Sequence, residues 1–125
     1  MNFRLRTSSV TAEILKNLQA STRLTPNILC RLAVSLSLRL KELPNIELKD
    51  TSGLEFNRNT LTGEFDYVYK ALITQHMKRE VTDEEYFPTL LNAHIERGIT
   101  LLESEYKHAG NPDRFLQNLL SIEGD

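Results

Sequence analysis

Several residue types are scarce in this chain of 125 residues, and each scarcity excludes a class of protein. A single cysteine, Cys30, excludes an intrachain disulfide framework and is typical of a reducing compartment. The apolar runs are far shorter than the roughly 20 residues that a membrane-spanning helix needs. No basic stretch followed by an apolar one begins the chain, as it would in a signal peptide. We therefore expect one cytoplasmic domain that buries its own core.

Charge is unevenly distributed, although the formal net charge is only −2. Residues 1–49 contain eight lysines and arginines against three glutamates, a net charge of +5. Residues 50–125 contain seven basic and fourteen acidic residues, a net charge of −7. Such asymmetry indicates a surface that faces a polyanion. Charges that only solvate two faces of the domain would give the same pattern, so both interpretations stay open.

The first 43 residues predict a strand followed by two helices. The segment FRLRT at residues 3–7 alternates apolar and polar residues, which is typical of a half-buried strand. The two serines that follow can cap a first helix that stops near residue 22. Thr25 before Pro26 predicts the start of a second helix, in which leucines recur at spacings of three and four until Pro44.

The rest of the chain predicts an irregular connection and further helices. Glycine, proline and asparagine punctuate residues 44–63, so we expect irregular structure there, with an extended piece at the letters LEF. Apolar spacing predicts a third helix over residues 64–79. Thr82 and Glu85 resemble a capping box, which begins a segment that Pro88 interrupts and that continues as a helix to about residue 107. A short last helix follows.

Strand, helix, turn and helix is the order of ribbon-helix-helix modules, in which strands of two chains pair and their outward side chains enter DNA. We predict a mainly α fold in one compact domain, with a ribbon-helix-helix-like part at residues 1–43 extended by a helical part at 64–121. Arg4 and Arg6 would face outward. A partner chain would pair with the strand, because a lone short strand leaves its edges unpaired. A frayed terminus before an ordinary helical hairpin is the alternative.

The sequence lacks the spacing of a catalytic or metal site. Cys30 could carry a persulfide, but that requires an exposed thiolate, and burial is the commoner fate of a lone cysteine. His76 and His94 share no short ligand spacing and fall on apolar stripes, which predicts hydrogen-bonded core histidines. The acidic run at residues 83–85 follows Thr82, where carboxylates favour the helix dipole. We predict no enzymatic activity, no metal and no cofactor.

Three runs of sequence resemble a known family: LTPNILCRLAVSLSL, GLEFNRNTLTGEFD and NAHIERGITLL. They make the chain similar, over roughly residues 3–121, to the DndE family of bacterial DNA sulfur-modification (phosphorothioation) proteins. The resemblance implies a subunit of a system that replaces a non-bridging oxygen of the DNA backbone with sulfur. It also implies a homotetramer that binds nicked double-stranded DNA, while other sulfur-modification proteins (a cysteine desulfurase, an iron–sulfur enzyme and a nucleotide-hydrolysing protein) carry the chemistry.

The resemblance implies DNA contacts at the matching basic positions, which are Arg4, Arg6, Lys16, Arg23 and Arg31. We therefore interpret the chain as a non-enzymatic subunit that binds duplex DNA, preferentially nicked, through backbone phosphates. The alternative is an oligomeric scaffold that docks the other sulfur-modification proteins through the acidic C-terminal half and binds DNA little. A sequence-specific repressor and a metal-dependent nickase are further alternatives.

Overall fold

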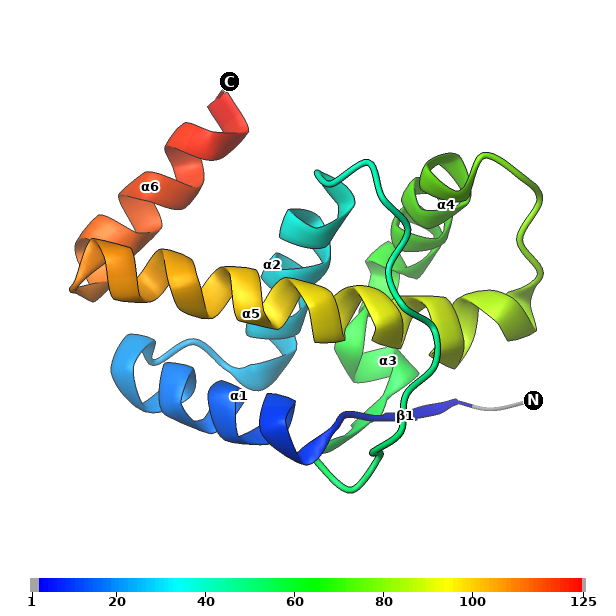
Figure 1. Ribbon diagram of the computed structural model, residues 1–125, viewed down its shortest axis with the longest axis horizontal. Coiled ribbons are helices and arrows are strands. Elements are labelled where there is room, and N and C mark those ends of the chain that lie inside the picture. Colours follow the sequence, from blue (N-terminus) through cyan, green and yellow to red (C-terminus); the bar gives the residue numbers. More distant parts are fainter. Residues whose placement is uncertain (1–2, 125) are drawn as a thin grey trace.

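The computed structural model describes residues 3–124 and is mainly helical (Figure 1). This confirms the predicted fold class, a mainly α domain with a short strand near its N-terminus. Within the described residues, none of the helices combines the length and the apolar character needed to cross a bilayer. The elements in chain order are β1 (Arg4–Arg6), α1 (Ser9–Thr22), α2 (Pro26–Leu38), β2 (Glu55–Asn57), α3 (Arg58–Leu61), η1 (Gly63–Phe65), α4 (Asp66–Met77), η2 (Glu85–Leu90), α5 (Leu91–Ala109) and α6 (Pro112–Gly124).

Helix α5 runs through the middle of the molecule and organises the other elements (Figure 1). It packs most extensively against α2 and also contacts α1, α6 and η2. The two backbones approach closely where Gly98 faces Ala33: a Cβ on Gly98 would lie 1.7 Å from the Ala33 carbonyl oxygen. Only glycine therefore permits this crossing of α2 over α5.

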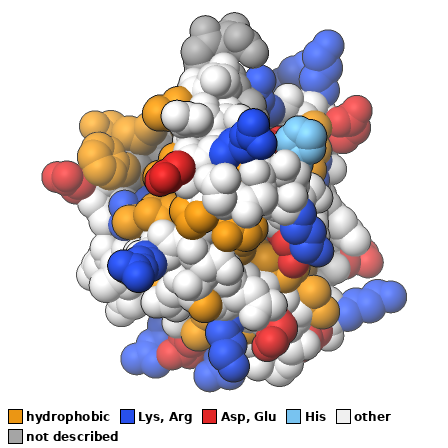
Figure 2. All heavy atoms as spheres, turned by 90° about the vertical axis from the view of Figure 1, so that its left-hand side faces the viewer, with side chains coloured by type: hydrophobic (Ala, Val, Ile, Leu, Met, Phe, Trp, Pro, Cys, Tyr) orange, Lys and Arg blue, Asp and Glu red, His pale blue; other side chains and the backbone are white. Residues whose placement is uncertain are grey.

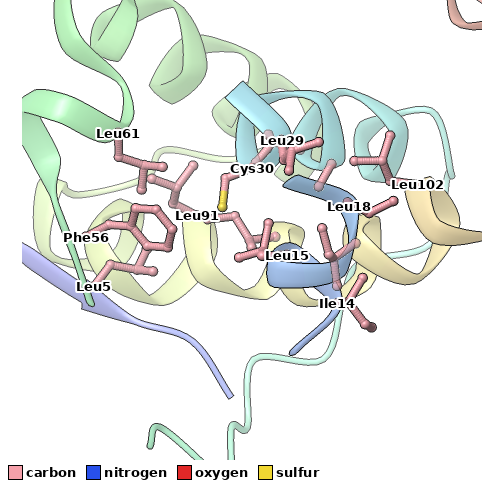
Figure 3. Close-up of a cluster of buried hydrophobic side chains, with 14 of the residues drawn as sticks. Leu5, Ile14, Leu15, Leu18, Leu29, Cys30, Phe56, Leu61, Leu91 and Leu102 are labelled. Carbon is pink, nitrogen blue, oxygen red and sulfur yellow. The ribbon is translucent and has the colours of Figure 1, made fainter. Parts of the chain in front are cut away.

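The core lies between α1, α2 and α5, and the two strands extend it at one end. The strand residues Leu5 and Phe56 lie together and continue the row of buried side chains (Figure 3). On α5 the fully buried residues recur at helical spacing, which is the pattern of an amphipathic helix pressed against a core. Burying such side chains is the main term that stabilises the fold.

The two strands pair within the chain. Leu5 of β1 lies opposite Phe56 of β2 in an antiparallel ladder. Backbone hydrogen bonds from Thr7 N to Leu54 O and from Arg58 N to Phe3 O continue the pairing at both ends. Strand β2 thus pairs with one of the two edges of β1 within the chain. Pairing of the other edge of β1 with a strand of a partner chain stays a prediction.

The second helix ends earlier than predicted. Helix α2 stops at Leu38, whereas its leucine pattern extends to Pro44. The reason is that side chains from other elements take the carbonyl groups at this end. Arg97 of α5 donates to the carbonyl oxygens of Ser37 (2.8 Å) and Glu42 (2.6 Å), so the chain turns away instead of continuing as helix.

Other local predictions are confirmed or refined. Thr82 N donates to Glu85 Oε1 and Glu85 N donates to Thr82 Oγ1, which is the predicted capping box. The 44–63 connection is largely irregular and contains β2, where the extended piece was expected, as well as α3. The predicted helix over 64–79 is η1 followed by α4, and Phe65 at its start is exposed.

Replacing Gly98 with alanine should destabilise the protein, because the new methyl group must push α2 and α5 apart. We expect the free energy of unfolding to fall by about 1–3 kcal/mol or more, the usual range for overpacking a core. Urea unfolding followed by circular dichroism measures this. Ser104→Ala, at an exposed position of the same helix, is the matched control and should change stability by less than about 0.5 kcal/mol. Equal stability of G98A and wild type would contradict the close crossing.

Candidate nucleic-acid interface

Strand β1 presents two arginines to solvent. Because side chains alternate along a strand, Leu5 points into the core while Arg4 and Arg6 point outward, as predicted. Their side chains are 69% and 55% exposed. The carboxylate of Glu55 on β2 pairs with both, at 2.9 Å from Arg4 Nη1 and 3.4 Å from Arg6 Nε. Exposed pairs of this kind are weak and salt-sensitive, so both guanidinium groups can exchange this partner for an anion.

Buried polar contacts from α5 fix the position of β1. Asn92 Nδ2 donates to the carbonyl oxygen of Arg6 (2.8 Å). The Glu96 carboxylate accepts from Ser8 N (3.0 Å) and Ser8 Oγ (2.7 Å), at the residue that caps α1. These contacts hold the backbone between the two arginines and α1, so the arginines project from a rigid base.

Gly53 closes the same junction from the other side. Its N–H donates to Thr7 O (2.9 Å), and a Cβ at this position would lie 2.1 Å from the carbonyl oxygen of Ser8. Gly53, the first residue of the GLEFNRNTLTGEFD run, therefore has a packing role: it allows the connection to lie directly against the start of α1.

An open hollow of about 490 Å³ lies beside β1. We call it the β1 hollow. It is lined by the arginines of β1 and Glu55 of β2, by the connection that precedes β2, and by η2 and the start of α5. The residues that line the hollow outside the two strands include Ile46, Leu48, Thr51, Pro88, Thr89 and Asn92.

Lys16 and Arg23 lie farther along α1. Lys16 is exposed on the helix, and Arg23 is the exposed C-cap residue, with φ 66°. Because α1 has 14 residues, its two ends are separated by about 20 Å at the 1.5 Å rise of a helix. Arg23 is therefore at the opposite end of α1 from β1, next to the start of α2 at Pro26 (Figure 1).

Arg31 is placed differently from the other four candidates. It is half-buried, and its Nε and Nη2 donate to the carbonyl oxygens of Leu61 (2.7 Å) and Thr60 (3.1 Å). Both acceptors belong to α3. Arg31 thus joins α2 to α3, and part of its guanidinium group is engaged in that contact.

The structure reveals an ionic cluster that the sequence pattern did not predict. Arg58 donates to Asp66 (2.7 Å) and to Asp83 (2.8 Å), and its guanidinium lies 5.2 Å from the ring centre of Tyr86. Burial acts against ionisation of Asp66, yet hydrogen bonds from Arg58, Thr62 and Tyr86 hold the pKa of its carboxyl below the ordinary value. Arg58 and Asp66 both lie in the GLEFNRNTLTGEFD run, so the distinctive sequence of that run was the signal that could have pointed to these two residues.

The position of the Arg58 cluster makes it a support for the sheet. Arg58 directly follows β2, and its guanidinium is mostly buried. The hydrogen bonds from Arg58 also lower the pKa of Asp83, so this member of the acidic run is ionised and paired with arginine. The carboxylates of residues 83 and 85 are thus engaged in ion pairs and capping.

Cys30 is fully buried, which confirms the prediction of a structural cysteine. Burial, and secondarily the negative charge of Glu96, raises the pKa of its thiol far above the ordinary value. A protonated thiol in the core is a poor nucleophile. No group of three or more metal-ligating side chains occurs in the part of the chain that the structure describes.

His94 is a buried, hydrogen-bonded histidine, as predicted. Its Nδ1 lies 2.8 Å from Ser37 Oγ, and that hydroxyl accepts from Arg97 Nε at 2.8 Å. The ring packs edge-on against His76, with ring centres 5.1 Å apart, although the two residues lie on different helices.

Comparisons with known proteins decide the family. The family model described as "DNA sulphur modification protein DndE" matches residues 4–110. The chain belongs to the DndE family. DndE from Escherichia coli B7A, described as involved in DNA phosphorothioation modification, has a similar crystal structure, with a TM-score of 0.67, 26% sequence identity and 82% of this chain and 97% of that chain covered.

A second DndE crystal structure, of a double glycine-to-lysine mutant, gives a TM-score of 0.64 and 25% identity over 83% of this chain and 99% of that chain. No curated protein matches. The resemblance drawn from the three sequence runs is thus confirmed, and this DndE-family chain is related to proteins of DNA phosphorothioation. Helix α6 lies outside the residues that the DndE family model matches.

The stability of this DndE-family domain should fall as the pH drops from 6.5 to about 4. Burial, with help from His76 and Arg97, lowers the pKa of His94 from 6.5 to about 4. In this window the unfolded chain binds a proton that the folded chain does not, so acid favours unfolding, by about 1.4 kcal/mol for each unit of pKa difference. The stability that the folded protein gains by keeping His94 neutral is fully present above pH 6.5.

Urea unfolding between pH 4 and 8 tests this prediction. The variant His94→Gln should show a flatter pH dependence than wild type across the window, whatever its absolute stability. His108→Gln removes an exposed histidine of the same helix and should retain the wild-type slope. Identical slopes for wild type and H94Q would show that His94 titrates normally.

Proposed function

We propose that this DndE-family chain is a non-enzymatic subunit of the DNA phosphorothioation system that binds duplex DNA, preferentially at nicks, through backbone phosphates. The observation that carries the proposal is the pair Arg4 and Arg6, exposed on a strand that α5 holds rigidly. Guanidinium groups bind phosphate oxygens through charge-assisted, often bidentate hydrogen bonds. Membership of a family named for DNA sulphur modification supports DNA as the source of these phosphates.

The far end of α1 offers a second phosphate contact. Arg23 lies beside the N-terminus of α2, which is 13 residues long and begins with the cap Thr25 and Pro26. Backbone N–H groups at such a helix start attract anions. With Lys16 between the two ends, the basic positions span about the length of α1, so one protomer can touch separate points of a duplex.

On the face that carries the far end of α1, lysine and arginine side chains are dispersed among acidic and hydrophobic ones and form no continuous band (Figure 2). Several copies could place their arginines along one duplex. We therefore propose a homo-oligomer, in keeping with the tetramer that the family resemblance implies, and exposed apolar side chains such as Val10 (66% exposed) offer contact surface.

Backbone contacts predict a strong dependence of affinity on salt. Each neutralised phosphate contributes a slope of about 0.9 in the logarithm of the binding constant against that of salt concentration. The quadruple variant with alanine at positions 4, 6, 16 and 23 should bind nicked and intact duplexes more weakly and with a flatter slope. Fluorescence anisotropy on both duplexes at several salt concentrations, with mass measured by light scattering, gives these values.

A matched control separates these contacts from net charge. Alanine at Lys41, Lys78, Lys107 and Arg114 removes the same number of positive charges from exposed positions elsewhere. This control should lose much less affinity than the quadruple variant. Equal losses in the two variants, or an unchanged slope in the quadruple variant, would reject the assignment to these four residues.

The second candidate function is a scaffold that docks other sulfur-modification proteins. The net charge of −7 over residues 50–125 favours it, because such a surface repels DNA and can attract basic partners. Pull-down of those proteins from nuclease-treated extract distinguishes the two functions. Retention of partners together with no binding to either duplex would establish the scaffold and overturn DNA binding.

A further inference from the structure

The β1 hollow is lined by both charged and apolar side chains. Arg4 and Arg6 contribute guanidinium groups, and Ile46, Leu48 and Pro88 contribute apolar surface. A volume of about 490 Å³ lies within the range of about 300–1,000 Å³ that is usual for small-ligand sites. A ligand that fits must combine an anionic end with a flat or apolar body of modest size.

The anionic end that suits these arginines is a phosphomonoester. Arg4 Nη1 donates to Glu55 Oε2 at 2.9 Å and Arg6 Nε donates to Glu55 Oε1 at 3.4 Å, so donors of both guanidinium groups already converge on one carboxylate. A terminal phosphate has its second pKa near 6 and carries almost two charges at neutral pH, whereas an internal phosphodiester carries one. The terminal group competes better with Glu55 for the same donors.

The body of the ligand meets polar groups as well as apolar ones. The exposed hydroxyl-bearing residues Thr51 and Thr89 line the hollow. Asn92 lines it too, and its Nδ2 holds the Arg6 carbonyl. Hydroxyl groups beside apolar side chains match a nucleobase and sugar, which combine flat faces with polar edges.

We propose that the β1 hollow binds a nucleoside 5′-monophosphate unit, with the phosphate on Arg4 and Arg6 and the base against Ile46, Leu48 and Pro88. This inference rests on the proposed function in one respect: the 5′ end of a DNA strand at a nick is the unit's source. An internal nucleotide is tied to the duplex on both sides, whereas a strand end can leave the stack at lower cost. The hollow thus supplies a physical reason for preferring nicks.

Two nicked duplexes that differ only in a 5′-phosphate or a 5′-hydroxyl at the nick test the inference. Wild type should bind the phosphorylated nick about tenfold more tightly, the effect of one strong charge-assisted contact. Free deoxyadenosine monophosphate should bind in calorimetry and compete with the phosphorylated nick. Deoxyadenosine and inorganic phosphate, each lacking one half of the unit, should compete far less.

Filling the hollow provides the variant test. Thr51→Tyr and Thr89→Tyr each add a ring at an exposed wall position, and each should abolish the preference for the 5′-phosphate. Thr100→Tyr, at an exposed position of α5 outside the hollow, is the matched control and should retain the preference. Thermal unfolding shows whether each variant is folded. Because two positions in the hollow are tested, the site can still be judged if one of the two tyrosine variants does not fold.

The outcomes distinguish the inference from the proposed function. Equal affinity for the two nicked duplexes, with no binding of the free nucleotide, would overturn the hollow as a nucleotide site and leave backbone binding intact. Binding of the free nucleotide without binding to any duplex would support the hollow, identify free nucleotides as the source and overturn DNA binding. A preference that survives both tyrosine variants would also reject the site.

Discussion

The close crossing of α2 over α5 at Gly98 is the constraint on which the rest of the fold depends. It brings α5 into the centre, where its first turn carries Asn92, which holds the backbone of β1, and its second turn carries Glu96, which holds the cap of α1. The exposed arginines are therefore positioned by the helix that organises the core. Any change that moves α5 should move the basic edge with it.

Local signals in the sequence were sufficient for most helix starts. Caps such as Thr25, and the box formed by Thr82 and Glu85, depend on neighbours within a few residues, so the sequence determines them directly. The end of α2 could not be predicted, because it depends on Arg97, which is about 60 residues away in the chain. The partner of β1 was unpredictable for the same reason, since β2 lies within a connection that has little periodicity.

The residues of the candidate site also divide into those whose placement follows from the local sequence and those whose placement depends on distant segments. Alternation along the first strand correctly placed Arg4 and Arg6 outward, and lone-cysteine statistics correctly placed Cys30 in the core. Periodicity could not show that Arg31 reaches across to α3, nor that Arg58 binds both Asp66, eight residues away, and Asp83, 25 residues away. Pairings between elements depend on the tertiary fold, and a single sequence carries no direct record of them. The β1 hollow could not be predicted either, because three separate segments of the chain form it.

The buried thiol of Cys30 gives the molecule an internal reporter of its own opening. It is the only cysteine of the chain, it is fully buried on α2 beside Leu61 of α3, Tyr69 of α4 and Ile95 of α5, and its thiol stays protonated. A thiol-directed label can therefore attach only when those helices separate. The rate of labelling would then measure how often the core opens locally, and it needs only the wild-type chain without an engineered probe. Ligands that bind the folded form would register as slower labelling.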